Sequence, residues 1–168
     1  FEQLAYTQKC LGKLEDTLGG LITYEVIIVD DASKDGTKEF LLSLKTPYRI
    51  FLNNTNQGFA KNNNFAAEKA KGEFLCFLNN DVFVMGNWLL PMIDVFKTKE
   101  KVGMVGNVQR LANSLRYDHM GMVFSPQAIS CHYGQGFFRR PFKGEVRQWS
   151  AVTAACCVTS KKNFHLNG

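Results

Sequence analysis

Apolar residues in the first hundred positions fall into two patterns, helical stripes and short continuous runs. One stripe predicts a first helix that ends at Gly19-Gly20, and it consists of Leu4, Leu11, Leu14 and Leu18. Further helices are expected over residues 37–44, 59–71 and 88–97, the last capped by Asn87. Strands are expected over residues 25–29, 49–52 and 74–78. The strands alternate with helices, which predicts the α/β class.

The second part of the chain is harder to interpret. Strands are expected over residues 103–108 and 151–158, and Ser160 is expected to cap a last short helix that ends at Asn167-Gly168. Residues 109–150 are rich in Gly, Arg and aromatic side chains and show no clear period. The histidines in this segment, His119 and His132, are expected to be structural. A catalytic Asp118–His119 pair is the less favoured alternative, because adjacent side chains rarely face the same way.

Length and composition indicate one globular domain. The 168 residues are 45% hydrophobic and 12% aromatic, which excludes a disordered chain. No apolar run approaches the roughly 18 residues of a membrane span, and no signal peptide is expected. The chain starts at Phe1 rather than Met, so we expect a piece of a longer protein. The pattern changes near residue 109, where any internal boundary is expected.

The net charge and the cysteines indicate which partners and which cellular compartment to expect. Twenty basic and 15 acidic residues give a net charge of +5, which permits an anionic partner. No basic run marks a nucleic-acid tail, so no nucleic-acid partner is expected, although DNA binding stays a distant alternative. The five cysteines include no Cys-x-x-Cys pair and are expected to be reduced, as in a cytoplasmic protein.

Polar residues follow two of the predicted strands. Asp30 and Asp31 come after the strand at 25–29, and Asn79-Asn80-Asp81 follows the strand at 74–78. Ligands of open α/β sheets bind outside the carboxyl ends of the strands, so these side chains are candidates for a binding site. Mg²⁺ and Mn²⁺ need only one or two protein carboxylates when phosphates supply the other ligands. Capped turns are the alternative interpretation of both segments.

Four segments resemble, in order and spacing, motifs of the family 2 glycosyltransferases. Residues 29–37 resemble the V-D-[DN]-x-S-x-D-G-T loop, and residues 56–64 resemble N-x-G-F-A-x-x-N-N. Residues 70–74 are similar to A-x-G-E-[YF], and residues 78–81 to the L-[DN]-x-D metal motif, with Asn79 at its first acidic position. The resemblance is strongest over residues 24–98.

The resemblance implies a GT-A fold, a mixed and mainly parallel sheet flanked by helices, in a single domain truncated at both ends. Residues 1–108 would form the nucleotide-sugar-binding half and residues 109–168 the acceptor-side half. The implied nucleotide-binding residues are Asp30, Asp31, Ser33, Gly58, Asn64, Asn79 and Asn80. Asp81 is implied to bind Mn²⁺ or Mg²⁺. Asp30 would accept a hydrogen bond from the ring N–H of uracil or thymine.

The implied activity is a hexosyltransferase-like transfer, with inversion, from a UDP- or dTDP-sugar to a glycan or lipid-linked acceptor. The family's catalytic base lies in a motif expected beyond Gly168, so no catalytic residue is assigned. A role in polysaccharide biosynthesis is expected at the cytoplasmic face of the membrane, with peripheral association through the parent protein. Two alternatives stay open, a sugar-phosphate nucleotidyltransferase and a non-catalytic module that binds glycans or nucleotides.

Overall fold

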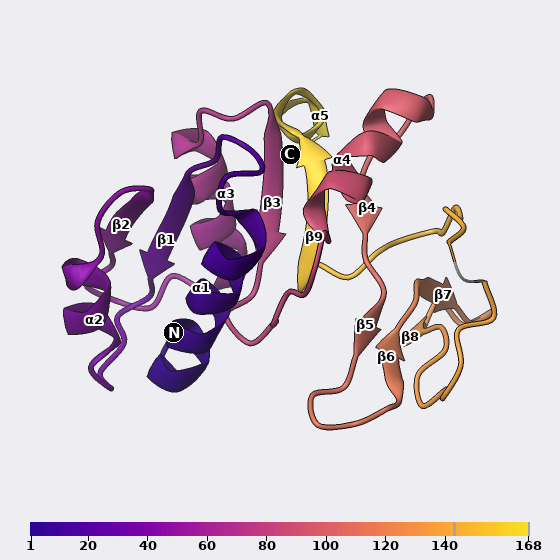
Figure 1. The fold of residues 1–168 in the computed structure, drawn as a ribbon, viewed down its shortest axis with the longest axis horizontal. Coiled ribbons are helices and arrows are strands. Elements are labelled where there is room, and N and C mark those ends of the chain that lie inside the picture. Colours follow the sequence, from indigo (N-terminus) through magenta and orange to yellow (C-terminus); the bar gives the residue numbers. More distant parts are fainter. Residues whose placement is uncertain (143, 168) are drawn as a thin grey trace. The chain divides into compact units, whose positions relative to one another are not determined.

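The computed structural model describes residues 1–142 and 144–167, and its mixed α/β architecture confirms the predicted class (Figure 1). The chain folds as two compact units. The first unit contains residues 1–75, 79–87 and the C-terminal residues from Ser160 on, and the second contains residues 76–78 and 88–159. Among the described helices, none has the length and apolar character required to cross a membrane.

The first unit is built on two parallel strands. Its elements are α1 (Leu4–Leu18), β1 (Val26–Asp30), α2 (Thr37–Ser43), β2 (Tyr48–Leu52), α3 (Phe59–Lys69) and α5 (Lys161–Asn167). The strands pair from Val26 opposite Tyr48 to Asp30 opposite Leu52, while α3 packs on β1 and α2 on β2. Because the strands run in the same direction, the loops after Asp30 and Leu52 leave the sheet at the same edge.

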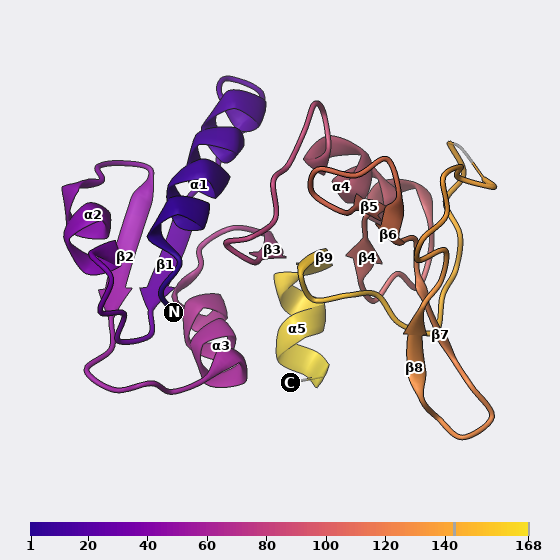
Figure 2. The same ribbon diagram turned by 90° about the horizontal axis from the view of Figure 1, so that it is seen from below.

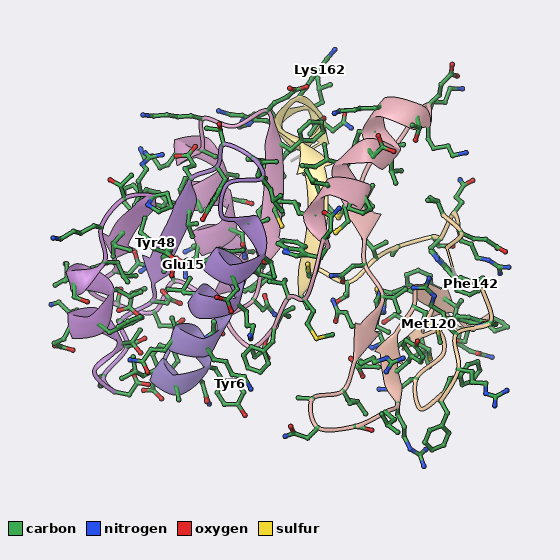
Figure 3. All side chains as sticks on the ribbon, viewed as in Figure 1. Tyr6, Glu15, Tyr48, Met120, Phe142 and Lys162 are labelled. Carbon is green, nitrogen blue, oxygen red and sulfur yellow. The ribbon has the colours of Figure 1, made fainter. Side chains whose placement is uncertain are left out.

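Helix α1 packs through the apolar stripe that the sequence predicts. Leu11, Leu14 and Leu18 are buried on this face. On its exposed side, the Tyr48 hydroxyl of β2 donates a 2.5 Å hydrogen bond to the Glu15 carboxylate, and the two side chains point toward each other (Figure 3). Packing and this hydrogen bond both attach α1 to the strand pair.

The second unit contains short strands and one helix. Its elements are α4 (Leu89–Thr98), β4 (Val105–Gly106), β5 (Gln109–Arg110), β6 (Tyr117–His119), β7 (Met122–Phe124), β8 (Ser130–His132) and most of β9 (Cys156–Ser160). β3 (Phe74–Leu78), β9 and β4 form a sheet in that order, and residues 156–159 are buried. β7 and β8 pair as an antiparallel hairpin (Figure 2).

An aromatic cluster forms a separate core in the second unit. It consists of Tyr117, Met120 and Phe142, with Tyr133 and Trp149 packed against it. Met120 and Phe142 are labelled in Figure 3. Gly134 has a φ of 77°, and a Cβ there would lie 2.1 Å from Cε of Met120. The left-handed backbone conformation favours glycine at this position, and any side chain here would also require the end of the Met120 side chain to move.

Several predicted boundaries are wrong, and three of them lie in the second unit. The cap of α4 is Trp88 rather than Asn87, and the helix begins at Leu89. The strand expected over 103–108 is limited to Val105–Gly106, the two residues that pair with β9. The strand expected over 151–158 starts at Cys156, because Ala155 N–H binds the Thr153 hydroxyl in a turn before it.

Other local predictions are confirmed. β3 spans Phe74–Leu78 as expected, and the Ser160 hydroxyl accepts a 3.1 Å hydrogen bond from Asn163 N–H at the start of α5. All five cysteines are free thiols, and three of them are buried. These thiols agree with the expected reduced state, while the cytoplasmic location stays a prediction.

Candidate active site

Asp30 is the last residue of β1, and a tight turn closes on its carboxylate. The residue is 4% exposed. Ser33 donates to it twice, from its N–H at 3.2 Å and from its hydroxyl at 2.5 Å. Each carboxylate oxygen has two acceptor positions, so after both Ser33 hydrogen bonds the group still has capacity for an N–H donor. The turn therefore orients an acceptor at the edge of the strand pair.

Asp31 holds two loops together. Its carboxylate accepts hydrogen bonds from Gln57 N–H at 2.7 Å, Gly58 N–H at 3.0 Å and the Asn53 amide at 2.9 Å. Burial raises the pKa of this carboxyl. Hydrogen bonds outweigh this effect and hold the pKa well below its usual range. They come from Gln57, Asn62, Asn53 and Gly58. The charged carboxylate thus ties the loop after β1 to the loop before α3.

Gly58 shapes the start of α3. Its φ of 82° is unfavourable for residues with a side chain, and no atom lies within 4 Å of a Cβ built there. The space above this backbone is therefore open, next to the N-terminus of an 11-residue helix. Asn64 lies exposed on the same helix. This opening favours an anionic group close to the helix N-terminus.

The loop after β3 presents a single carboxylate. Val82 N–H donates to the Asn79 carbonyl at 3.2 Å, which closes a turn around Asn80 and Asp81. Asp81 is exposed, and its carboxylate takes part in no hydrogen bond or ion pair with the described residues. Within the described part of the chain, no group of three or more His, Cys, Asp or Glu residues is arranged to hold a metal ion. One carboxylate with the Asn79 amide oxygen fits a Mg²⁺ or Mn²⁺ ion that is also bound by phosphates.

The backbone of Glu2 links the turn on Asp30 to the loop that carries Asp81. Its N–H donates to the Ser33 hydroxyl at 2.6 Å, and its carbonyl accepts from the Asn80 amide at 3.5 Å. The turn on Asp30 and the loop of Asp81 thus meet at one peptide segment ahead of α1. Hydrogen bonds therefore connect Asp30, Ser33 and Asn80 within the first unit.

The sequence profile of glycosyl transferase family 2 matches residues 2–163. The chain belongs to glycosyl transferase family 2. Two similar proteins are the glycosyltransferase AglE of Haloferax volcanii and the O-antigen biosynthesis protein RfbC of Myxococcus xanthus. The first is 34% identical over 85 residues, which cover 49% of this chain and 28% of AglE. The second is 33% identical over 113 residues, which cover 63% of this chain and 9% of RfbC.

One solved structure supports the GT-A-like fold. The chain is similar to the mannosyltransferase PcManGT from Pyrobaculum calidifontis, whose structure contains GDP-Man and Mn²⁺, with a TM-score of 0.57 at 21% identity. The match covers 66% of this chain and 33% of that chain. This glycosyl transferase chain therefore spans about a third or less of the proteins that it matches.

Several residues of this family 2 site are missing from the sequence-based assignment. Asn53 and Asn62 complete the hydrogen-bond network of Asp31, and Thr7 of α1 binds Asn80. Asn53 directly follows β2, so the rule that ligands bind at the carboxyl ends of strands identifies it as a candidate. Nothing in the local sequence identified Thr7, because its partner is distant along the chain.

Two of the three histidines of the glycosyl transferase chain, His119 and His132, lie in the second unit. His119 is 1% exposed, and its Nδ1 has no hydrogen-bond partner. Burial and the neighbouring His132 lower the pKa of His119, while Asp118 opposes this shift. Asp118 lies 3.8 Å from Nδ1 of His132, and no hydrogen bond joins it to its neighbour His119. The alternative of a catalytic Asp118–His119 pair gains no support from this geometry.

Proposed function

We propose that the protein transfers a hexose, with inversion, from a UDP- or dTDP-sugar to a glycan or lipid-linked acceptor. The observation that carries the proposal is the arrangement around Glu2. It joins an oriented acceptor, Asp30, to the loop of an unpaired carboxylate, Asp81. Family membership supports glycosyl transfer in general, and the donor, acceptor and stereochemistry are part of the proposal.

Asp30 is proposed to recognise the base of the nucleotide. A carboxylate can only accept hydrogen bonds, so it suits the ring N–H of uracil or thymine. Ser33 and Asp31 shape this pocket, Ser33 by orienting Asp30 and Asp31 by fixing the loop of Gly58. With Gly58 and Asn64 beside the nucleotide, the open start of α3 favours the negatively charged diphosphate.

Asp81, with Asn79 and Asn80 on the same loop, is proposed to hold Mn²⁺ or Mg²⁺ against the diphosphate. When bound, the ion would screen the negative charge that develops on the leaving nucleoside diphosphate. Inversion requires the acceptor hydroxyl to attack opposite this leaving group and to lose its proton to a base. We assign that base to no residue of this chain.

The proposed biosynthetic role and cellular location extend the proposal beyond the site itself. RfbC is named for O-antigen biosynthesis, which favours a role for this chain in polysaccharide biosynthesis. We propose a cytoplasmic location at the membrane face, with peripheral association through the parent protein. Residues 109–168 are proposed to form the acceptor-side half of a single domain.

A thermal-shift panel tests the donor assignment. The protein is melted with UDP, dTDP, GDP and CMP, each with Mn²⁺, with Mg²⁺ and with EDTA. A ligand at 100 times its dissociation constant stabilises the protein by about 2.7 kcal/mol, which is readily detected. We expect a metal-dependent shift with UDP or dTDP. A shift with GDP alone would mean that the donor is a GDP-sugar instead. Glycan binding without nucleotide binding would favour the non-catalytic module.

Variants of the two aspartates test the site itself. Asp81→Ala is expected to abolish the metal-dependent part of the shift, whereas Asp30→Ala is expected to weaken nucleotide binding with and without metal. Asp94→Ala removes an exposed carboxylate from α4 and serves as the control. Unchanged metal-dependent binding in Asp81→Ala would refute the metal assignment. Production of pyrophosphate instead of a nucleoside diphosphate would favour the nucleotidyltransferase.

A further inference from the structure

One face of α1 holds the loop that carries Asp81. The Thr7 hydroxyl accepts a 3.0 Å hydrogen bond from the Asn80 amide, and Thr7 is only 6% exposed. Three residues further along the helix, Sγ of Cys10 lies 3.7 Å from the Asn79 carbonyl. Residues three apart lie on the same helix face, so Thr7 and Cys10 contact the loop together. The loop is thus attached to the helix at two consecutive residues before Asp81.

A second set of contacts attaches the loop just after Asp81. The ring of Phe83 stacks on Tyr6 of α1, with centroids 5.9 Å apart and planes 13° apart (Tyr6 is labelled in Figure 3). Nζ of Lys9 lies 4.1 Å from the centroid of the Phe83 ring. Asp81 therefore lies between two attached segments, while its own carboxylate stays unpaired. A free carboxylate on a fixed backbone is a suitable arrangement for a metal ligand.

We propose that Thr7 is a positioning residue, whose hydroxyl fixes Asn80 and thereby sets the position of the Asp81 carboxylate for metal-dependent nucleotide binding. The proposal rests on the proposed function, because it assigns Asp81 to the metal. It adds a residue on α1, outside every motif by which the family was recognised. Thr7 acts through Asn80 and needs no contact with the nucleotide or the ion.

The hydroxyl of Thr7 is the stronger of the two partners of the Asn80 amide. The other partner, the Glu2 carbonyl, lies 3.5 Å away, at the limit of a hydrogen bond. Without the hydroxyl, the Asn80 amide would keep no short hydrogen bond at a site where Thr7 is buried, and an unsatisfied donor there is unfavourable. The expected response is a shift of the Asn80 side chain, with movement of the adjacent Asp81.

The test compares Thr7→Val, which keeps the shape and removes the hydroxyl, with Thr7→Ser, which keeps the hydroxyl. UDP and GDP binding is measured by calorimetry over a Mn²⁺ titration and in EDTA. In Thr7→Val, the Mn²⁺ concentration for half-maximal binding should rise roughly three- to tenfold, the effect of one lost hydrogen bond. Thr7→Ser should match the wild type, and nucleotide affinity in EDTA should be the same in all three proteins.

A matched control and a double variant separate positioning from general damage. Thr17 lies on the same helix, and its hydroxyl binds the Lys13 carbonyl, so Thr17→Val should leave the Mn²⁺ dependence unchanged. If Thr7 acts through Asn80, the Thr7→Val/Asn80→Ala double variant should lose no more than Asn80→Ala alone. Additive losses, or an equal loss of affinity in EDTA and in Mn²⁺, would overturn the proposal.

Hydrogen exchange keeps this inference separate from the proposed function. The Val82 N–H donates to the Asn79 carbonyl, so its protection reports on the order of the Asp81 loop without any ligand. Protection should fall in Thr7→Val and persist in Thr7→Ser. If the wild type binds no nucleotide, the proposed function fails, and the exchange data still decide the role of Thr7. Unchanged protection at Val82 in Thr7→Val would overturn it.

Discussion

Asp31 in the first unit and His119 in the second are both buried titratable residues, with 5% and 1% exposure. Their surroundings differ. The carboxylate of Asp31 accepts hydrogen bonds from Asn53, Gln57 and Gly58, whereas Nδ1 of His119 has no partner. The ring of His119 instead packs edge-on against His132, with centroids 4.7 Å apart. One residue is buried with its charge satisfied, and the other is buried as a neutral ring.

The pKa values of both groups are lowered, but with opposite meaning for charge. For Asp31, hydrogen bonds outweigh burial and stabilise the ionised form. For His119, burial and the adjacent His132 disfavour the protonated form. Buried charge is therefore kept where two loops must be joined, and it is avoided in the packed core of the second unit. This difference leads to three tests.

The largest effect is expected from Asp31→Ala. The substitution leaves three donors without their acceptor, from Asn53, Gln57 and Gly58. A hydrogen bond to a charged group contributes about 1.5–3 kcal/mol, and such contributions are not additive. We therefore expect the free energy of unfolding to fall by about 3 kcal/mol. Urea unfolding measures it. Asp31→Asn keeps one acceptor oxygen and should lose about half as much.

The matched control is Asp16→Ala on α1. Asp16 forms an exposed ion pair with Lys13 at 3.2 Å. Exposed pairs contribute little, so the change should stay within about 0.5 kcal/mol. Equal losses in Asp16→Ala and Asp31→Ala would show that the network of Asp31 adds no stability, contrary to the comparison above.

The same comparison explains what the sequence could and could not predict. Asp31 and Gly58 belong to segments with recognisable spacing, so the sequence alone predicts their loops. Thr7 escapes prediction because its partner Asn80 is 73 positions away and only the fold brings the two together, whereas the position of Asn53 directly after β2 identifies it as a candidate. In the second unit, strands of two or three residues carry too few positions for a period to appear.

A smaller effect is expected from the pH dependence of His119. Its folded pKa is lowered, so below about pH 6.5 the unfolded chain binds more protons than the folded one. Stability contributed by the neutral ring is therefore complete above about pH 6.5 and falls as the pH decreases, by at most about 1.4 kcal/mol per pH unit. Urea unfolding between pH 5 and 8 measures this slope.

His119→Leu should remove that slope. The titratable groups that act on His119 are His132 on β8 and Asp118 on β6. Because His132 helps to lower the pKa of His119, His132→Leu should reduce the pH dependence without removing it. An identical slope in the wild type and in His119→Leu would contradict the assignment.

Asp31 gives a separate pH dependence. Its folded pKa is also lowered, so its contribution is present above about pH 4 and lost as the pH falls further.

The smallest effect is expected from Tyr48→Phe, which removes a hydrogen bond to a carboxylate at the surface of the first unit. The Tyr48 hydroxyl donates to Glu15 at 2.5 Å, and burial together with this carboxylate raises the pKa of Tyr48, so the hydroxyl remains a donor (Figure 3). The chemistry matches that at Asp31, but Glu15 is exposed to water, which competes for its oxygens. We expect the free energy of unfolding, measured with urea, to fall by about 0.5 kcal/mol.

A loss as large as that of Asp31→Ala would mean that burial and the number of donors do not decide the strength of these carboxylate contacts. A loss near the expected value would leave burial and donor number as the reason that Asp31, and not Glu15, fixes the loops of the site.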